Sequence, residues 1–407
     1  MSSICEPKKK LNLIRQQFPA LKNQTVFLEN AGGSQVPIVV ADAIRQYYLH
    51  CYAQLGAEYL ESRRATSIVE KTHDWMAIFT NAGSNPVIIG PSSSVLLRIL
   101  GDSMAPAISN GDEIIVAESG HEANISPWLR LQDKGAVIRW LPIPENQSTC
   151  CTFELEKRLN KNTKIVAIPH VSNLLGDIVD VKKIADMAHS FGAKVVVDGV
   201  AFAPHRAIDV TDWDVDWYVF SNYKVFGPHM AVMVGKTDAF VGLEGPNFFF
   251  VHPSELSYKF ELGGVNHEGC AGVLALADYF KVITGLKSVD RNLVCNAYEL
   301  MEELERPLIR RILDFLSSKP SVQVLGKPDL KTKVGTISFV HRSRSSREIA
   351  SMANQQDIGI RNGHMYAHRL CQSLGIEPED GVVRISLVHY NSDIDVDKLI
   401  HFLDQVL

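Results

Sequence analysis

The sequence predicts an α/β protein built on a mostly parallel β-sheet that is covered by helices. In the middle of the chain, short runs of β-branched residues alternate with stretches whose apolar residues recur every three or four positions. This alternation is typical of strands joined by crossover helices, which place successive strands parallel in one sheet. Hydrophobic residues make up 46% of the 407 residues and charged residues 21%, as in ordinary globular proteins.

The strands and helices of the sheet can be placed in chain order. Six apolar runs predict strands at 87–89, 113–117, 136–141, 164–169, 194–198 and 217–220. Helical spacing between and after them predicts helices at 93–101, 124–135, 181–190 and 269–283. Because each helical stretch has one apolar face, we expect each helix to cover the sheet.

The last third of the chain has a different pattern, which predicts a smaller α+β domain. A long helix at 289–318 leads to strands at 335–340, 358–361 and 382–388, with helices at 346–355 and 396–406. We therefore expect a large domain over 36–285 and a small C-terminal domain over 286–407. The N-terminal segment, 1–35, is expected to pack on the small domain.

Charge and cysteine content exclude several classes of protein. With 41 Lys and Arg against 46 Asp and Glu, the net charge of −5 offers no basic surplus for nucleic acid. The seven cysteines form no CxxC pair, which argues against a disulfide framework. Cys150 and Cys151 are expected to be exposed thiols in a polar loop. No apolar run approaches the length of a membrane span and no signal peptide is evident, so a cytoplasmic protein is expected.

A lysine and an aspartate follow two of the predicted strands. Asp198 ends the strand at 194–198, where a carboxylate points into the cleft beyond the strand ends. Lys224 follows the strand at 217–220 and is a candidate imine-forming amine. Pyridoxal 5′-phosphate needs an amine for its aldehyde and an anion for its ring nitrogen. We expect Lys224 to supply the amine, and Asp198 to keep the ring nitrogen protonated so that the ring accepts electrons.

Other residues match the remaining needs of that cofactor. A Gly-Pro turn leads through three serines at 92–94 into a predicted helix, whose N-terminal N–H groups and dipole favour a phosphate. His121 follows a strand end and is a candidate to stack on the ring. Asn173 follows the next strand end and is a candidate to bond the ring hydroxyl, with His170 as a weaker site candidate.

At these positions the chain resembles the class V aminotransferase family of fold type I pyridoxal-phosphate enzymes, and within it the group II cysteine desulfurase-like branch. The matching segments are 27–33, 121–128, 170–173, 198–199, 221–228, 260–263, 361–364 and 384–391, which extend over nearly the whole chain. The resemblance implies a large pyridoxal-phosphate-binding domain with a seven-stranded, mostly parallel sheet and a smaller C-terminal α+β domain. It also implies a homodimer with shared sites.

The resemblance assigns roles to individual residues. It makes Lys224, Asp198 and His121 the catalytic residues, as the imine lysine, the ring-nitrogen partner and the stacking residue. Arg384 matches the position that clamps the substrate carboxylate, a task suited to a guanidinium. The implied cofactor ligands are Ser92, Ser93, His121, Asn173, Asp198, Ser221, Tyr223 and Lys224, and the implied substrate ligands are Arg384, Arg361 and Tyr366.

The largest departure from the family pattern is at the nucleophilic thiol. Group II desulfurases carry a cysteine in an Arg-x-Gly-x-x-Cys loop, and Tyr366 stands at that position here. A phenol cannot form a persulfide, so the usual route lacks its acceptor. Cys371, five residues further on, is a weak candidate to replace it.

Three smaller departures concern the cofactor ligands. The family's ring-contacting glutamine is Ala201, for which His205 is a candidate replacement. The histidine before the lysine is Tyr223, whose hydroxyl can still donate a hydrogen bond. A threonine that the family donates across the dimer is Gly264, which has no side chain to donate.

These observations favour a carbon–sulfur β-elimination lyase that acts on a cysteine-type amino acid. The alternatives are a class V aminotransferase or epimerase, and a pyridoxal-phosphate-binding scaffold without turnover. A sulfur-acceptor protein is a candidate partner. His364 and His368 are four residues apart, but the zinc-protease pattern needs a Glu after the first His, so no metal site is expected.

Overall fold

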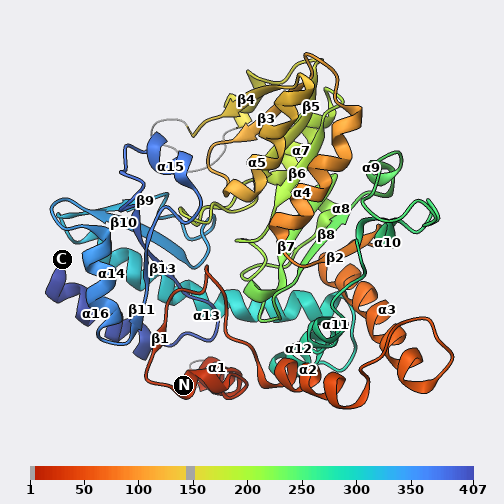
Figure 1. The fold of residues 1–407 in the computed structure, drawn as a ribbon. Coiled ribbons are helices and arrows are strands. Elements are labelled where there is room, and N and C mark those ends of the chain that lie inside the picture. The colour runs from red at the N-terminus through yellow and green to blue at the C-terminus, as the bar shows by residue number, and fades with distance from the viewer. Residues whose placement is uncertain (1–4, 144–151) are drawn as a thin grey trace.

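The computed structural model describes residues 5–143 and 152–407. The prediction of exposed thiols at Cys150 and Cys151 therefore falls outside the described residues. A large sheet and a small sheet lie side by side, each with its own helices (Figure 1). In the part of the chain that is described, no helix combines the length and the apolar character needed to cross a membrane.

The large sheet has seven strands and is parallel except for one strand. They are β2 (Val87–Gly90), β3 (Glu113–Ala117), β4 (Val137–Leu141), β5 (Thr163–Pro169), β6 (Lys194–Asp198), β7 (Trp217–Ser221) and β8 (Ala231–Gly235). The order is β2-β8-β7-β6-β5-β3-β4, and β8 runs antiparallel to both of its neighbours. The predicted α/β class with a mostly parallel sheet is confirmed.

Strand β8 was not among the six strands expected from the local pattern. Its chain reverses direction directly after β7, through a 3₁₀ turn, η5 (Asn222–Lys224), and the Gly227–Pro228 turn, without a crossover helix. The alternation of strands and helices therefore fails at this point. The reversal places Lys224 at the carboxyl end of β7.

Helices cover both faces of the large sheet. They are α2 (Ile38–His50), α3 (Leu60–Thr80), α4 (Ser93–Met104), α5 (Ser126–Leu129), α6 (Thr152–Glu156), α7 (Val181–His189), α8 (Val210–Trp213), α9 (Thr237–Phe240), α10 (Leu256–Phe260), α11 (His267–Leu274) and α12 (Leu276–Thr284). Successive residues of a strand enter different cores: Val195 and Val197 pack with α3 and α7, and Val196 packs with α4 and α5. This is the alternation that a sheet buried on both faces requires.

Two predicted helices are broken in the structure. The stretch at 124–135 consists of η3 (Glu122–Asn124), α5 and η4 (Arg130–Lys134). Pro127 lies in the first turn of α5, where a residue without an N–H is tolerated, and Gly135 ends η4 with a φ of 90°. The stretch at 269–283 is divided between α11 and α12.

The small sheet is antiparallel and has the order β12-β13-β10-β9. Its strands are β9 (Val322–Leu325), β10 (Thr336–His341), β12 (Arg361–Gly363) and β13 (Val382–Ser386), and its helices are α14 (Ser346–Asn354), α15 (His368–Ser373) and α16 (Asp393–Val406). The strand expected at 358–361 is divided into β11 (Ile358–Gly359) and β12. Strand β11 pairs in parallel with β1 (Val26–Phe27).

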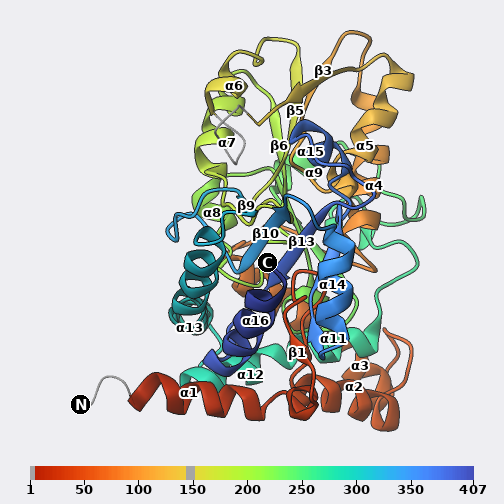
Figure 2. The same ribbon diagram turned by 90° about the vertical axis from the view of Figure 1, so that its left-hand side faces the viewer.

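The N-terminal segment contacts both cores. It begins with α1 (Cys5–Gln16) and a 3₁₀ turn, η1 (Pro19–Lys22). Ile14 and Phe18 are buried in the core of the large sheet, whereas Val26 and Leu28 are buried in the core of the small sheet. Figure 2 shows α1 below both sheets.

The long helix α13 (Arg291–Ser317) joins the two cores. Its first half buries Leu293, Ala297 and Tyr298 in the core of the large sheet. Its second half buries residues of the range 308–316 in the core of the small sheet. Pro307 lies between the two halves, and the helix continues through it.

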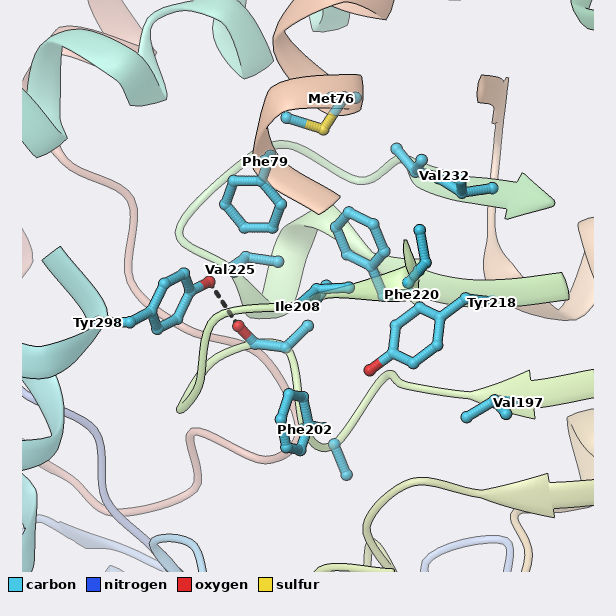
Figure 3. Packing of buried hydrophobic residues seen from close by; sticks show 14 of the residues in the cluster. Met76, Phe79, Val197, Phe202, Ile208, Tyr218, Phe220, Val225, Val232 and Tyr298 are labelled. Carbon is cyan, nitrogen blue, oxygen red and sulfur yellow. Dashed lines mark hydrogen bonds between the residues drawn. The ribbon is translucent and has the colours of Figure 1, made fainter. Parts of the chain in front are cut away.

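Aromatic packing behind β7 fixes the strand that leads to Lys224 (Figure 3). Phe220 of β7 stacks on Phe79 of α3 with the ring centroids 5.6 Å apart and the planes 16° apart. The Tyr298 hydroxyl donates a 2.6 Å hydrogen bond to the Ala203 carbonyl. The end of β7 is therefore fixed by the packing of Phe220 on Phe79, which is itself buried.

Candidate active site

The candidate residues gather where the carboxyl ends of β3, β5, β6 and β7 meet the small sheet. His121 follows β3, Asn173 follows β5, Asp198 ends β6, and Lys224 follows β7. A cavity of about 640 Å³ is lined by His121, Asn173, Lys224 and Arg384 together with other residues of both sheets. A smaller pocket of about 50 Å³ adjoins it and contains Asp198. The position at the strand ends is where open α/β sheets bind ligands.

Lys224 lies at the bottom of this cavity with only 7% of its surface exposed. Burial, and to a smaller extent the nearby Arg384 guanidinium, lower the pKa of its amine to about 8, whereas Asp198 acts in the opposite direction. A neutral amine is the nucleophilic form that attacks an aldehyde. The surroundings of Lys224 therefore favour imine formation near neutral pH.

Asp198 is a buried carboxylate that faces the same small pocket as Lys224. Its Oδ1 accepts a 3.0 Å hydrogen bond from the backbone N–H of Val200. Burial raises the pKa of this carboxyl, while the Val200 bond and the charge of Lys224 lower it. A cationic ring nitrogen brought beside Asp198 would favour the charged carboxylate by direct charge pairing.

His121 is held in one orientation beside Lys224. Its Nδ1 accepts a 3.0 Å hydrogen bond from the backbone N–H of Ala123, so the neutral ring carries its proton on Nε2. Burial, followed by the charges of Lys224 and Arg384, lowers the pKa of His121 to about 4. The ring is therefore neutral at pH 7 and presents a flat face suited to stacking.

The predicted phosphate ligands do not all face the pocket. The Ser92 hydroxyl caps α4 by accepting a 3.2 Å hydrogen bond from the Val95 N–H. Ser93 and Ser94 line the small pocket, and the buried Ser221 hydroxyl donates a 3.1 Å hydrogen bond to the Ser93 hydroxyl. The phosphate corner thus consists of the N-terminus of α4 and the end of β7, with Ser94 nearer to the pocket than Ser92.

Tyr223 borders the same corner and lines both cavities. Its ring stacks on His229 with centroids 5.0 Å apart and planes 13° apart. Burial raises the pKa of its phenol, while its interaction with Ser221 lowers that pKa. The phenol is therefore protonated at neutral pH and keeps its hydrogen for donation.

Two arginines from neighbouring strands of the small sheet face the large cavity. Arg384 of β13 pairs in register with Arg361 of β12, and both line the cavity. The Arg384 side chain is buried, and its Nη1 donates a 3.2 Å hydrogen bond to the Asn173 carbonyl. Burial and the charge of Arg361 lower the pKa of Arg384 to about 10 against the opposing effect of Glu29. Arg361 itself pairs with Glu29 at 2.8 Å.

Tyr366 lies at the cavity rim on a tightly held loop. Its side chain is 67% exposed, and its ring lies 5.1 Å from that of His121. Met365 and Tyr366 both have positive φ, 50° and 62°. Non-glycine residues hold this conformation only where the surrounding contacts enforce it. Here the Tyr366 carbonyl accepts from the Glu122 N–H at 2.9 Å, and the Met365 carbonyl accepts from Asn173.

Cys371 does not replace the missing thiol. It is fully buried under the loop among Leu174, Leu370 and Val382, and burial raises its pKa to about 11. Such a thiol is neither ionised nor accessible at neutral pH. Groups of three or more metal-ligating side chains are absent from the described residues.

Two histidines named by the sequence lie outside both cavities, so these expectations are wrong. His170 stacks on Phe202 with centroids 3.6 Å apart and pairs through Nδ1 with the Tyr218 hydroxyl at 3.0 Å. His205 pairs with the buried Glu305 at 2.8 Å and cannot serve in place of Ala201, which does line the small pocket. Both histidines satisfy a buried polar partner, which strand position alone could not reveal.

The cavity also contains residues without a sequence signal. Arg347 and Glu379 of the small-sheet region line it. Ala31 and Gly32 of the N-terminal segment also line it, and both belong to the matching segment 27–33. No motif marks Arg347 or Glu379.

Pyridoxal phosphate fits the donors and acceptors of this site. Two buried polar atoms that face it, Oδ1 of Asn173 and Nε of Arg384, have no hydrogen-bond partner among the described residues. Buried polar groups normally have partners, and an amino-acid adduct of the cofactor would offer both a hydroxyl and a carboxylate. Lys224, Asp198 and the α4 N-terminus would supply the amine, the acid and the phosphate donors for such a cofactor.

Comparison with known proteins agrees with this geometry. Residues 26–399 match the family model described as aminotransferase class-V. The chain is 36% identical over 404 residues to the aminotransferase-like protein FGM3 of Gibberella zeae, covering 97% of this chain and 98% of that protein. It is 31% identical to the cysteine desulfurase-like protein ustD of Aspergillus flavus, covering 97% and 90%.

A solved structure gives the same result. The apo structure of a cysteine desulfurase from Thermococcus onnurineus superposes with a TM-score of 0.86 at 25% sequence identity, covering 97% of each chain. A family match over most of the chain, relatives above 30% identity and a shared fold lead to one conclusion. The chain belongs to the class V aminotransferase family of pyridoxal-phosphate-dependent enzymes.

Proposed function

We propose that this enzyme binds pyridoxal 5′-phosphate at Lys224 and eliminates the β-substituent of a cysteine-type amino acid, as a carbon–sulfur lyase. The proposal rests on one observation: a buried lysine of lowered pKa, a buried aspartate and a buried arginine lie together at the two adjoining cavities. Tyr366 stands there in place of the thiol. The balanced reaction converts cysteine and water into pyruvate, ammonia and hydrogen sulfide.

The residues divide the work in a way that follows from their positions. The bound cofactor would supply an aldehyde for imine formation and an electron-withdrawing ring. Arg384 would hold the substrate carboxylate, because its guanidinium is buried and its Nε lacks a partner among the described residues. Lys224, displaced by the substrate amine, would remove the proton from the substrate Cα. Asp198 would remain charged beside the ring nitrogen.

Tyr366, which stands where the family has its thiol, favours release of the sulfur as sulfide over its transfer to the protein. In the lyase reaction, the Cβ–S bond breaks with its electron pair going to sulfur, and sulfide leaves after protonation. No protein thiolate is needed for this step, so Tyr366 is compatible with it, whereas persulfide transfer requires a thiolate at that position. Cys371 is too deeply buried to take that part.

Aminotransfer is the second candidate, and the similarity to the aminotransferase-like protein FGM3 favours it. The same removal of the Cα proton serves both reactions, and they differ in whether the β-substituent leaves. Epimerisation and a scaffold role without turnover are weaker candidates. We further propose a homodimer in the cytoplasm that accepts a small amino acid, with a sulfur-acceptor protein as a candidate partner.

The visible spectrum of the purified protein tests this proposal. We expect a band at about 410–430 nm from the imine of the cofactor, and a change of that band when L-cysteine is added. Sulfide and pyruvate should appear together in equal amounts, and Lys224→Ala should abolish both. A 2-oxo acid that retains the β-sulfur, together with the aminated form of the cofactor, would indicate aminotransfer. A protein with the band but without any response to amino acids would support the scaffold.

A further inference from the structure

Residues 172–178, which we call the bridging segment, connect the end of β5 to the small sheet. The hydrogen bonds that attach it include Val334 N–H to the Gly176 carbonyl at 2.9 Å, Ile178 N–H to the Thr332 carbonyl at 2.7 Å, and the Ser338 hydroxyl to the Leu174 carbonyl at 2.6 Å. Gly176 has a φ of 74°, and a Cβ there would lie 2.1 Å from the Thr336 carbonyl oxygen. The backbone of the bridging segment therefore lies directly against the start of β10, with no room for a side chain at position 176.

A fully buried ion pair lies inside this junction. Lys333, at 0% exposure, pairs with Asp177, at 1% exposure, with Nζ 3.2 Å from Oδ1. Lys333 also donates to the Leu175 carbonyl, and the second oxygen of Asp177 accepts from the Lys327 N–H at 3.1 Å. A Cβ at Gly326 would lie 2.5 Å from that oxygen, so only glycine permits the approach. Buried charges persist only with such close partners.

The bridging segment also holds the substrate side of the active site. At its start, the Asn173 carbonyl accepts the Nη1 hydrogen of Arg384 at 3.2 Å. The Asn173 amide donates to the Met365 carbonyl at 2.7 Å and so fixes the loop that carries Tyr366. One residue therefore orients both the candidate carboxylate ligand and the strained rim loop, and it lies four residues from Asp177.

We propose that Lys333 and Asp177 are positioning residues that fix Arg384 and the Tyr366 loop through the bridging segment. This inference rests on the proposed function in one respect, which is that Arg384 binds the substrate carboxylate. Neither Lys333 nor Asp177 lines the cavity, so the effect must pass through Asn173. Side chains that bind a substrate lose their alignment when the contacts that hold them from behind are removed.

The test compares Lys333→Met with a matched control in the full-length holoenzyme. The control is Glu305→Leu, which breaks another buried pair, with His205 at 2.8 Å, that touches neither cavity. Both variants should lower the thermal midpoint. Only Lys333→Met should raise KM for the amino acid, by about tenfold, with a smaller change in kcat and an unchanged cofactor band. Asp177→Asn, which preserves shape, should shift KM in the same direction by less.

Amide hydrogen exchange in the absence of substrate gives a second readout that does not depend on any reaction. Lys333→Met should accelerate exchange at 361–367 as well as at 172–178, whereas Glu305→Leu should leave 361–367 at the wild-type rate. If Lys333→Met and Asp177→Asn keep wild-type exchange at 361–367 and KM within about twofold, the pair is only a structural cross-link. If the wild-type enzyme releases neither sulfide nor pyruvate, the exchange result still decides this inference by itself.

Discussion

The lowered pKa of Lys224 leads to a measurable pH dependence of cofactor attachment. A lysine with the ordinary pKa of about 10.4 has about 0.04% of its amine neutral at pH 7. With a pKa of about 8, Lys224 has roughly a tenth of its amine neutral at the same pH. Because only the neutral amine attacks an aldehyde, the structure predicts attachment about 200-fold faster than for an unshifted lysine of equal reactivity.

The assay follows the visible band as cofactor-free protein is mixed with pyridoxal phosphate at pH values from about 6 to about 10.5. This range includes both the lowered pKa of Lys224 and the ordinary pKa of lysine. A simple alkylamine in the same buffers, with its rate expressed per neutral amine, corrects for the titration of the cofactor itself. We expect the corrected rate to rise about tenfold per pH unit up to about pH 8 and then to level off. A corrected rate that still rose tenfold per pH unit above about pH 9 would refute the reasoning, because it would mean that Lys224 has the ordinary lysine pKa of about 10.4.

Two variants test the causes of the shift with opposite signs. Asp198 raises the pKa of Lys224, so Asp198→Asn should move the midpoint to lower pH. Arg384 lowers the pKa of Lys224, so Arg384→Met should move the midpoint to higher pH. Burial is the largest cause and is unchanged in both variants, so each midpoint should stay below the ordinary value of lysine. Shifts of the same sign in both variants would contradict the assignment of these charges.

Three further changes have expected outcomes. Arg384→Lys should raise KM for the amino acid by roughly 10- to 100-fold, because an ammonium cannot make the paired hydrogen bonds of a guanidinium; steady-state kinetics check this, and an unchanged KM would place the substrate carboxylate elsewhere. Tyr366→Cys should accumulate a persulfide when L-cysteine is added, seen in the intact mass as one added sulfur atom, because position 366 is exposed at the cavity rim; no added sulfur would mean that the leaving group does not reach the loop. Phe220→Ala should lower the free energy of unfolding by about 3–5 kcal/mol in urea titrations, because it leaves a cavity where a fully buried ring packs on Phe79. A loss below about 1 kcal/mol, which is typical of a surface substitution, would contradict this packing.

The sequence predicted the sheet better than the connections between its strands. The strands at 113–117 and 194–198 were predicted with the observed bounds, because their apolar runs end at clear polar or glycine residues. The helix expected at 124–135 failed, since apolar spacing does not register the local geometry that Pro127 and Gly135 impose. Strand β8 was missed because its run returns antiparallel, without the helix that the pattern led us to expect.

The candidate site was also predictable only in part. The positions of Asp198 and Lys224 at strand ends were predictable, since the topology of a parallel sheet brings its carboxyl ends together. His170 satisfies the same positional rule but is turned toward Phe202 and Tyr218, and only tertiary packing decides this. Arg347 lines the cavity from α14, which is far in the sequence from the strand ends, so no local pattern could predict its place in the site.

The helix α13 has a consequence for how the molecule loses its structure. Its two halves are built into two different hydrophobic cores, with no linker between them. Loss of one core would leave half of α13 without its packing, so this helix couples the unfolding of the two sheets, as do the bridging segment and the N-terminal segment. We therefore expect the two parts to unfold together, and neither part to fold well when it is excised from the other.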